Sequence, residues 1–253
     1  MTQPQTILVT GATSGFGRSI ASRLVREGHR VIATGRRSER LASLHEELGS
    51  TLLPLTLDMS DRAALRALPG SLPEGWQDVD VLINNAGLAL GVTPAQDSSV
   101  DDWETMIDTN ISGLVEITHA LLPGMIKRGQ GYVLSIGSTA GHYAYRGGNV
   151  YGATKAFVSQ FMKNLRTDLL GTPLRVTTIE PGLVGGSEFS NVRLRDDAKA
   201  RAVYENTTPL MPADIAETVS WLIGLPAHMN VNHLELMPVC QASGGLAVMK
   251  KEG

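Results

Sequence analysis

The stretch that restricts the fold most strongly is a short apolar run followed by closely spaced glycines. Residues 6–10 are rich in β-forming side chains, and Gly11, Gly15 and Gly17 follow at Gly-x-x-x-Gly-x-Gly spacing. Residues 19–25 then show the apolar spacing of a helix. Strand, glycine loop and helix in this order are typical of a dinucleotide site, because glycines let the backbone approach a pyrophosphate and the helix N-terminus offers N–H donors. A plain turn is the alternative interpretation of the loop taken alone.

The rest of the chain alternates β-rich runs with helical patterns. We expect strands near residues 30–34, 51–57, 79–83, 130–137, 174–180 and 234–239, and helices near 39–48, 61–68, 99–128, 151–169 and 214–223. Continuous apolar strands are typical of a parallel sheet buried on both faces. The pattern predicts an α/β fold, a single doubly wound Rossmann domain over residues 1–253 with a seven-stranded parallel sheet and helices on both faces. The short stretch 69–76 predicts a surface turn rather than a domain boundary.

Composition argues against several classes of partner. The chain has 253 residues and a formal net charge of −3, which indicates neither a nucleic acid nor a membrane surface as partner. Cys240 is the only cysteine, so no internal disulfide can form. We expect a cytoplasmic protein, because neither a secretory signal nor an apolar run of about 18 residues is visible. The six histidines are scattered without metal-ligand spacing, so no metal site is expected.

The residues after the second expected strand indicate which dinucleotide is preferred. Sites that prefer NAD carry an acid there, about 20 residues past the glycine loop, to bind the ribose 2′-hydroxyl. This chain carries Arg36 and Arg37 instead. Because guanidinium groups suit a 2′-phosphate, the sequence predicts NADP. Two solvated surface arginines are the alternative.

Polar residues also follow the third and fourth expected strands. Asp58 and Met59 end the third, where the carboxylate could accept a hydrogen bond from an adenine amino group. Asn84 and Asn85 follow the fourth, and their amides need partners. We expect them to tie adjacent loops together, with Asn85 facing the cofactor ribose; a plain turn is the alternative.

Tyr151 and Lys155 carry the most specific chemistry. They are four residues apart on an expected helix and therefore share one face. The ammonium should lower the pKa of the phenol from about 10 toward neutrality, so that the tyrosine can exchange a proton. Ser138, at the end of a strand, could hydrogen-bond a substrate oxygen, and Asn110, within an apolar helical stripe, needs a partner or a role. Taken alone, Tyr-x-x-x-Lys would also fit an ordinary solvated pair.

A charged segment follows the sixth expected strand, which Pro181 and Gly182 end. Residues of about 183–210 combine glycines with many charged side chains. This segment, called the lid below, is typical of a substrate lid beside an active site. A variable surface insertion is the alternative.

In combination these motifs resemble those of the short-chain dehydrogenase/reductase family, over essentially the whole chain. The motifs are Thr10-Gly11-x-x-x-Gly15-x-Gly17, Asp58, Asn84-Asn85-Ala86-Gly87, Asn110, Ser138, Tyr151-x-x-x-Lys155 and Pro181-Gly182. The resemblance implies that Asn110, Ser138, Tyr151 and Lys155 form a catalytic tetrad. The cofactor-binding residues that it implies are Gly11, Ala12, Thr13, Ser14, Gly15, Phe16, Arg36, Arg37, Asp58, Met59, Asn85, Tyr151, Lys155, Pro181, Gly182, Leu183, Val184, Gly185, Gly186, Ser187, Glu188 and Phe189.

Residues 102–110, 147–158 and 180–193 are similar to the NADP-dependent 3-hydroxy acid dehydrogenase group. That group is also described as L-allo-threonine or serine dehydrogenases and malonic semialdehyde reductases. The resemblance implies a small hydroxy acid as substrate, such as L-serine, L-allo-threonine or 3-hydroxypropionate. It also implies a homotetramer, paired through the helices that carry Asn110 and Tyr151, with the C-terminal strand and tail at the other interface.

The hypothetical mechanism assigns a role to each group. Tyr151 takes the hydroxyl proton, Ser138 holds the oxygen, Lys155 holds the nicotinamide ribose, and Asn110 anchors a water for proton relay. Arg193 in the lid is the first choice for binding the substrate carboxylate, with Arg146 second. Two alternatives remain: a reductase of 3-oxoacyl thioesters, sugars or ketones, and a non-catalytic NADP-binding sensor, which the retained tyrosine and lysine disfavour.

Overall fold

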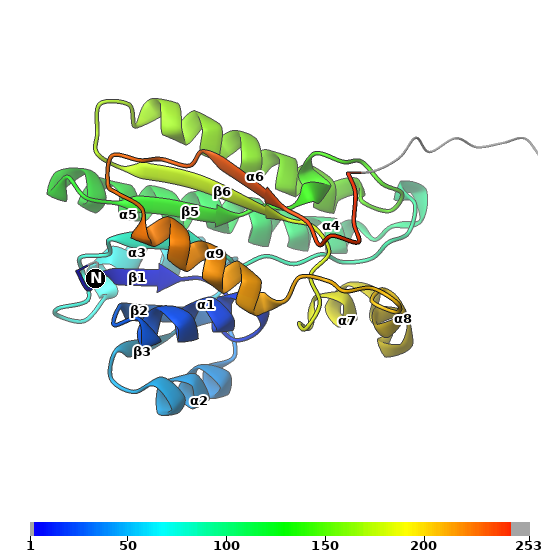
Figure 1. Ribbon diagram of the computed structural model, residues 1–253, viewed down its shortest axis with the longest axis horizontal. Coiled ribbons are helices and arrows are strands. Elements are labelled where there is room, and N and C mark those ends of the chain that lie inside the picture. Colours follow the sequence, from blue (N-terminus) through cyan, green and yellow to red (C-terminus); the bar gives the residue numbers. More distant parts are fainter. Residues whose placement is uncertain (1–2, 244–253) are drawn as a thin grey trace, which may run out of the picture.

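The computed structural model describes residues 3–243 and contains a parallel sheet in the order β3-β2-β1-β4-β5-β6-β7 (Figure 1). The strands are β1 Thr6–Val9, β2 Arg30–Gly35, β3 Leu52–Thr56, β4 Val81–Asn84, β5 Tyr132–Ile136, β6 Arg175–Pro181 and β7 His233–Leu236. The predicted seven-stranded parallel sheet is therefore confirmed, with strand ends that shift by up to three residues. The C-terminal tail expected at a subunit interface lies outside the described residues from 244 onward.

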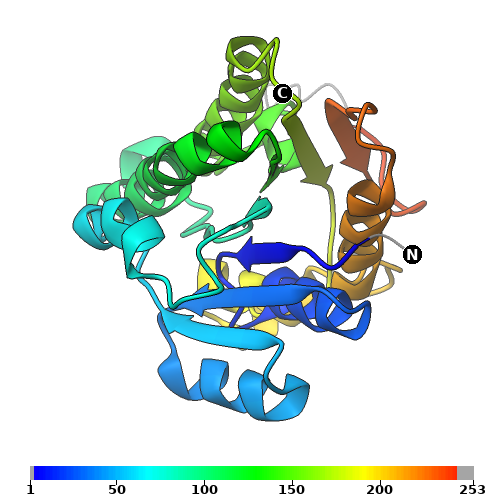
Figure 2. The same cartoon turned by 90° about the vertical axis from the view of Figure 1, so that its left-hand side faces the viewer.

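Helices cover both faces of this sheet, as Figure 2 shows. On one face lie α1 Gly15–Arg26, α2 Ser38–Leu48 and α9 Pro212–Gly224, and on the other lie α3 Arg62–Ser71, α5 Gly113–Arg128 and α6 Asn149–Asp168. Strand side chains alternate between the two cores: Ile7 and Val9 of β1 pack with the first group, and Leu8 packs with the second. Continuous apolar strands are what a sheet buried on both faces requires.

The strand order reverses beside β1, which pairs with β2 on one side and β4 on the other. Crevices outside the carboxyl ends of parallel strands open at such a switch point. The loops that follow β1, β2, β4, β5 and β6 all lead to this edge. The topology therefore brings together the motifs that the sequence places after successive strands.

Four local features differ from the sequence-based expectation. The helix expected over 99–128 is divided into α4 Val100–Ile107, a π-helical turn η2 Asp108–Ser112, and α5. Helix α3 continues to Ser71 and takes up the start of the stretch predicted as a turn. The lid contains two short helices, α7 Phe189–Leu194 and α8 Asp197–Ala202. Two 3₁₀ turns, η1 Ala95–Asp97 and η3 Thr139–Gly141, were also not predicted.

Within residues 3–243, the helices are all too short or too polar to span a bilayer.

Candidate active site

A cleft of about 340 Å³ opens at the carboxyl edge of the sheet. The predicted site residues that line it are Gly11, Thr13, Ser14, Gly15, Phe16, Arg36, Arg37, Asp58, Met59, Asn85, Tyr151, Lys155, Ser187, Glu188 and Phe189. The predicted residues that are absent from its lining are Ala12, Asn110, Ser138, Arg146, Arg193 and 181–186. Segments widely separated in the sequence therefore form one concave surface, large enough to bind a small molecule or part of a cofactor.

The glycine loop is shaped by close backbone contacts. Gly11 and Gly15 have φ of +69° and +51°, in the region that favours glycine. A Cβ on Gly17 would lie only 2.3 Å from the Gly11 carbonyl oxygen and 2.5 Å from Asn85 Nδ2. Asn85 Nδ2 itself donates to the Thr10 carbonyl at 2.8 Å. The N-terminus of α1 therefore opens into the cleft with free backbone donors, an arrangement suited to an anion.

The neighbouring asparagine and Asp58 are held by local partners. Asn84 Nδ2 donates to Thr118 Oγ1 at 2.9 Å and ties β4 to α5. Asp58 Oδ1 accepts from the backbone N–H and the hydroxyl of Ser60, both at 2.9 Å. Asn85 ties the loop after β4 to the loop after β1, as expected of the tandem asparagines, whereas Asn84 joins a strand to a helix rather than two loops. Asn85 also lines the cleft.

The two predicted phosphate-binding arginines differ in their surroundings. Arg36 is exposed at the cleft, whereas Arg37 donates to Thr13 Oγ1 at 3.0 Å and forms a 2.8 Å ion pair with Glu188 of the lid. Arg40 forms a second 2.8 Å pair with Glu188. Hydrogen bonds from Arg40 and Arg37 lower the pKa of Glu188 to about 2. Sequence reasoning missed Arg40, although it stands only one helical turn beyond Arg36.

Burial governs the ionisation of Tyr151 and Lys155. Both side chains lie on α6, and each is only 7% exposed. Burial raises the pKa of Tyr151 to about 12, against smaller lowering by a hydrogen bond with Ser138 and by the charge of Arg193. Burial lowers the pKa of Lys155 to about 8, and its ammonium donates to the Ile136 carbonyl at 2.8 Å. The predicted lowering of the tyrosine pKa by Lys155 is therefore wrong for the chain by itself, because desolvation of the phenolate outweighs nearby charge.

Asn110 lies in the π-helical turn and is buried. Its Nδ2 donates to the Leu88 carbonyl at 2.9 Å and to Thr154 Oγ1 at 3.1 Å, and its Oδ1 accepts from the Leu88 N–H at 2.9 Å. A Cβ on Gly87 would lie 3.3 Å from Asn110 Oδ1 and 3.5 Å from Lys155 Nζ. The amide and the ammonium therefore approach each other at Gly87. Both amide hydrogens have protein partners, which leaves Oδ1 as the atom that could accept from a water.

Arg193 of the lid lies above the tyrosine. Its guanidinium carbon is 5.4 Å from the Tyr151 ring centroid and 5.3 Å from that of Tyr145. Nη2 donates to the Tyr145 hydroxyl at 2.7 Å, and Nε donates to the Gly91 carbonyl at 3.2 Å. Tyr145, which sequence reasoning missed, thus helps to hold Arg193. Arg146, which follows Tyr145 in the chain, is exposed and does not line the cleft.

Ionic contacts hold the lid against the rest of the molecule. Besides the pairs of Glu188 with Arg37 and Arg40, Arg195 forms a 2.7 Å ion pair with Asp102 of α4. The first part of the segment predicted to contact the cofactor is hydrogen-bonded to the C-terminal region. The Gly182 N–H donates to the Leu236 carbonyl at 2.7 Å, and the Leu183 N–H donates to Gln241 Oε1 at 2.6 Å. Only its last three residues, 187–189, reach the cleft.

One polar cluster outside the cleft has no counterpart in the sequence analysis. His142 and His233 both contact the buried carboxylate of Glu180. His142 and His233 are 38 and 53 residues away from Glu180 in the chain, so no local spacing could reveal the cluster.

Comparison with known proteins identifies close relatives. Residues 5–197 match the short chain dehydrogenase family. The chain is 61% identical over 243 residues to the NADP-dependent 3-hydroxy acid dehydrogenase YdfG of Salmonella typhimurium, covering 96% of this chain and 98% of the relative. It is 49% identical over 247 residues to serine 3-dehydrogenase of Rhizobium radiobacter, covering 97% of this chain and 98% of that one.

Solved structures give the same result. The closed form of a serine dehydrogenase complexed with NADP+ matches with a TM-score of 0.96 and 58% identity, covering 98% of this chain and 100% of the other. Serine dehydrogenase from Escherichia coli matches with a TM-score of 0.84 and 54% identity, covering 94% and 100%.

Proposed function

The chain belongs to the short-chain dehydrogenase family, and on this basis we propose that it is an NADP-dependent oxidoreductase of small 3-hydroxy acids. It would transfer hydride between NADP and the carbon that bears the 3-hydroxyl group, with L-serine, L-allo-threonine and 3-hydroxypropionate as candidate substrates. Relatives named as NADP-dependent 3-hydroxy acid dehydrogenase and serine 3-dehydrogenase support this proposal. We further propose that residues 1–253 act as one domain, in the cytoplasm, where NADP and small hydroxy acids are available.

The residues of the cleft fit NADP. The glycine loop leaves no room for a Cβ at Gly17, and the N-terminus of α1 offers N–H donors for the diphosphate. Arg36 is exposed at the cleft and would hold the 2′-phosphate together with Arg37. When held by these residues, NADP would supply the hydride donor or acceptor, and its oxidised form carries a positive charge. Such charge favours the phenolate and opposes the effect of burial on the Tyr151 pKa.

The tetrad residues have separate tasks in this proposal. Ser138 and Tyr151 would hold the 3-hydroxyl, and Tyr151 would take its proton as hydride leaves. Lys155, with a pKa of about 8, is mostly protonated at neutral pH and would hold the nicotinamide ribose and favour the phenolate. Asn110 anchors the loop after β4 through Leu88 and joins it to α6 through Thr154. Its Oδ1 lone pair is the proposed anchor for a relay water.

The observation that carries the choice of an acid is the position of Arg193. Its guanidinium lies 5.4 Å from the Tyr151 ring, so a carboxylate bound to Arg193 would leave the 3-carbon of a short acid near the phenol. The charge-assisted pair would be shielded by the lid and by Tyr145. The position of Arg193 disfavours the two alternative functions. A thioester substrate has no carboxylate for Arg193 to bind. A non-catalytic sensor does not need an arginine placed beside a proton-transferring tyrosine.

The test compares an acid with its uncharged amide. For 3-hydroxypropionate, Arg193→Gln should lower kcat/KM about 100-fold, since a charge-assisted hydrogen bond contributes about 1.5–3 kcal/mol. For 3-hydroxypropionamide it should change kcat/KM less than about threefold. Arg146→Gln, which alters the neighbouring exposed arginine, is the matched control. Equal losses on acid and amide, or a larger loss in Arg146→Gln, would exclude Arg193 as the carboxylate-binding residue.

We also propose that the chain forms a homotetramer, with α4, α5 and α6 at one interface and β7 at another. Exposed apolar side chains on the outer sides of these helices support this arrangement. Ile107 of α4 is 41% exposed, Ile126 of α5 46%, and Phe157 of α6 38%, and Phe157 stacks on Phe161.

A further inference from the structure

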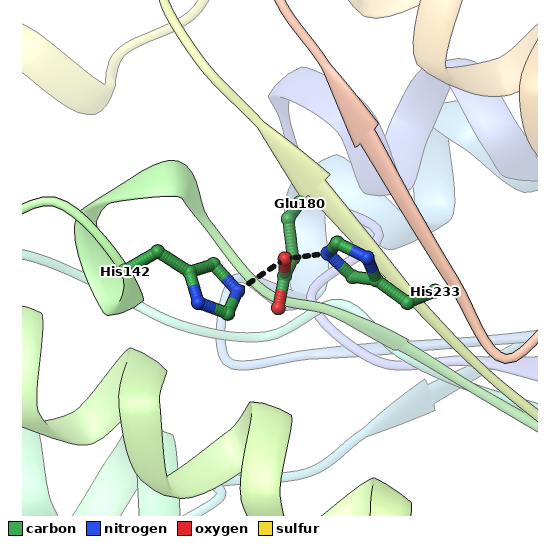
Figure 3. A group of neighbouring side chains, drawn as sticks. All are labelled: His142, Glu180 and His233. Carbon is green, nitrogen blue, oxygen red and sulfur yellow. Dashed lines mark hydrogen bonds and ion pairs between the residues drawn. The ribbon is translucent and has the colours of Figure 1, made fainter. Parts of the chain in front are cut away.

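We propose that His142, Glu180 and His233 form a binding site for a divalent transition-metal ion, with Zn²⁺ as the best match. Figure 3 shows the two imidazoles on opposite sides of the Glu180 carboxylate, each with Nε2 directed at it. The three candidate ligand atoms lie within 4.8 Å of one another. Tetrahedral zinc with bonds of about 2.1 Å requires ligand separations of about 3.4 Å. His142 Nε2 lies 2.6 Å from Glu180 Oε2, so the imidazoles would have to move away from the carboxylate as an ion enters between them.

The fold builds this cluster from three segments. Glu180 is on β6, His233 is on the neighbouring strand β7, and His142 follows the 3₁₀ turn η3 after β5. In the β6–β7 register Thr178 pairs with His233 and Glu180 pairs with Glu235, so these side chains project from one face of the sheet. Figure 3 shows the η3 loop bringing His142 over this same face. Two of the three proposed ligands are thus on hydrogen-bonded strands, and His142 comes from the loop after η3.

The environment of Glu180 favours a cation. Its carboxylate is 0% exposed, and within residues 3–243 its side-chain partners are Ser159 and the two histidines, without any lysine or arginine. A buried carboxylate requires compensation, which a metal ion would provide. Glu235, a second carboxylate on the same face, accepts a hydrogen bond from the Tyr143 hydroxyl at 3.3 Å and adds negative potential.

The second carboxylate oxygen of Glu180 is fixed from behind. Ser159 Oγ, on α6 one turn beyond Lys155, donates to Glu180 Oε1 at 2.5 Å. This leaves Oε2, the oxygen that both imidazoles contact, directed at the cluster. Hydrogen bonds of this kind orient metal ligands and commonly change metal affinity 10–100-fold when removed.

Two imidazoles and a carboxylate are the donor set of many three-ligand zinc sites with an open fourth position. In the single chain the His142 and His233 side chains are 31% and 37% exposed, which leaves an open side for a fourth ligand such as water. Imidazole donors select Zn²⁺, Co²⁺, Ni²⁺ or Cu²⁺ over Mg²⁺. A bound ion would fasten β7 and the loop after Ser138 to β6.

The test titrates untagged, chelator-treated full-length protein with Zn²⁺ by calorimetry and with Co²⁺ by visible absorption. We expect one ion per chain. The stoichiometry is expressed per chain rather than per assembly, because β7 is in a proposed subunit interface. His142→Ala and His233→Ala should each weaken binding at least about 100-fold, and Ser159→Ala should weaken it about 10-fold. Zn²⁺ should raise the Tm of the wild type and should not raise that of the two histidine variants.

Two control variants remove exposed zinc-binding side chains elsewhere. His228→Ala and Cys240→Ser should retain the affinity and the Tm shift of the wild type. Circular dichroism checks that both histidine variants are folded. Because both histidines are partly exposed, we expect each variant to fold, and one folded variant is enough for the test. The absence of saturable binding in the wild type would overturn the proposal. So would unchanged affinity in a folded His142→Ala or His233→Ala variant, which would identify the cluster as a hydrogen-bonded triad only.

Discussion

Lys155 and Tyr151 show that a side chain's neighbours in sequence do not determine its ionisation. The four-residue spacing correctly placed both on one helix, but it predicted a lowered tyrosine pKa. In the folded chain burial raises that pKa to about 12 and lowers that of Lys155 to about 8. The depth of burial depends on the packing of β5, α6 and the lid, which no local pattern encodes.

Lys155 should make stability depend on pH in alkaline solution. Its pKa is about 8 in the fold and 10.5 when unperturbed, so the unfolded chain binds the extra proton between these values. The desolvation cost is full below about pH 8 and disappears as the pH rises toward 10.5. In thermal unfolding, the stability of the wild type relative to Lys155→Met should therefore increase from pH 8 to pH 10.

The matched control for this experiment is Lys163→Met, which replaces an exposed lysine on the same helix. The stability difference between the wild type and Lys163→Met should stay constant over the same pH range. Lys155→Met also loses the hydrogen bond to the Ile136 carbonyl, so the change of the stability difference with pH is the diagnostic quantity and not its absolute value. If the stability difference between the wild type and Lys155→Met did not change with pH, the lowered pKa of the buried Lys155 would be contradicted.

At the scale of single elements, the glycine loop was predictable because its requirement is local. Gly11 and Gly15 have positive φ, which favours glycine, and at Gly17 the close approach of the Gly11 carbonyl leaves no space for a Cβ. The π-helical turn at Asn110 was not predictable, because the apolar stripe of 99–128 continues across it. The helices of the lid were also not predicted. Helix α8 begins at a local cap, Asp196, whose Oδ1 accepts from the Ala198 and Lys199 N–H groups, but the charged composition of the segment indicated only exposure.

Gly17→Ala tests the loop directly. The added Cβ would meet the Gly11 carbonyl at 2.3 Å, which forces the loop or α1 to move. We expect a loss of about 1–3 kcal/mol in the free energy of unfolding and at least about a tenfold weaker affinity for NADP. Denaturant titration and fluorescence titration measure the two effects.

Gly70→Ala provides the comparison, because a Cβ there has nothing within 4 Å and the residue is inside α3. That variant should be neutral or slightly stabilised, by up to about 1 kcal/mol, and should bind NADP normally. If Gly17→Ala had normal stability and normal NADP affinity, the close contact between Gly17 and the Gly11 carbonyl would be refuted.

At the scale of the whole molecule, fold class and strand number followed from the alternation of strands and helices, because right-handed crossovers leave few arrangements of such a chain. The order β3-β2-β1-β4-β5-β6-β7 then brings the loops that line the cleft together at one edge of the sheet. The His142–Glu180–His233 cluster also arises only at this scale. Its members meet because β6 and β7 pair and the η3 loop folds over them.

Subunit assembly is the corresponding prediction for the whole molecule. Light scattering should give about four times the chain mass of 27.0 kDa. Phe157→Asp should reduce that mass, because it places a charge on the exposed aromatic pair of α6. Leu170→Asp, at a residue 78% exposed beyond the end of α6, should not. A monomeric wild type, or an intact tetramer in Phe157→Asp, would contradict the proposed interface.

The most direct measurement is NADP+ reduction, followed by absorbance, with L-serine, L-allo-threonine and 3-hydroxypropionate offered separately and NAD+ in parallel. We predict turnover on at least one acid with NADP+, little with NAD+, and a loss of at least about 100-fold in Tyr151→Phe, with Tyr143→Phe as the exposed control. If the protein binds NADP but reduces no NADP+ with any of the three acids, the proposed substrate class is contradicted. Turnover that survives in Tyr151→Phe would contradict the proposed chemistry.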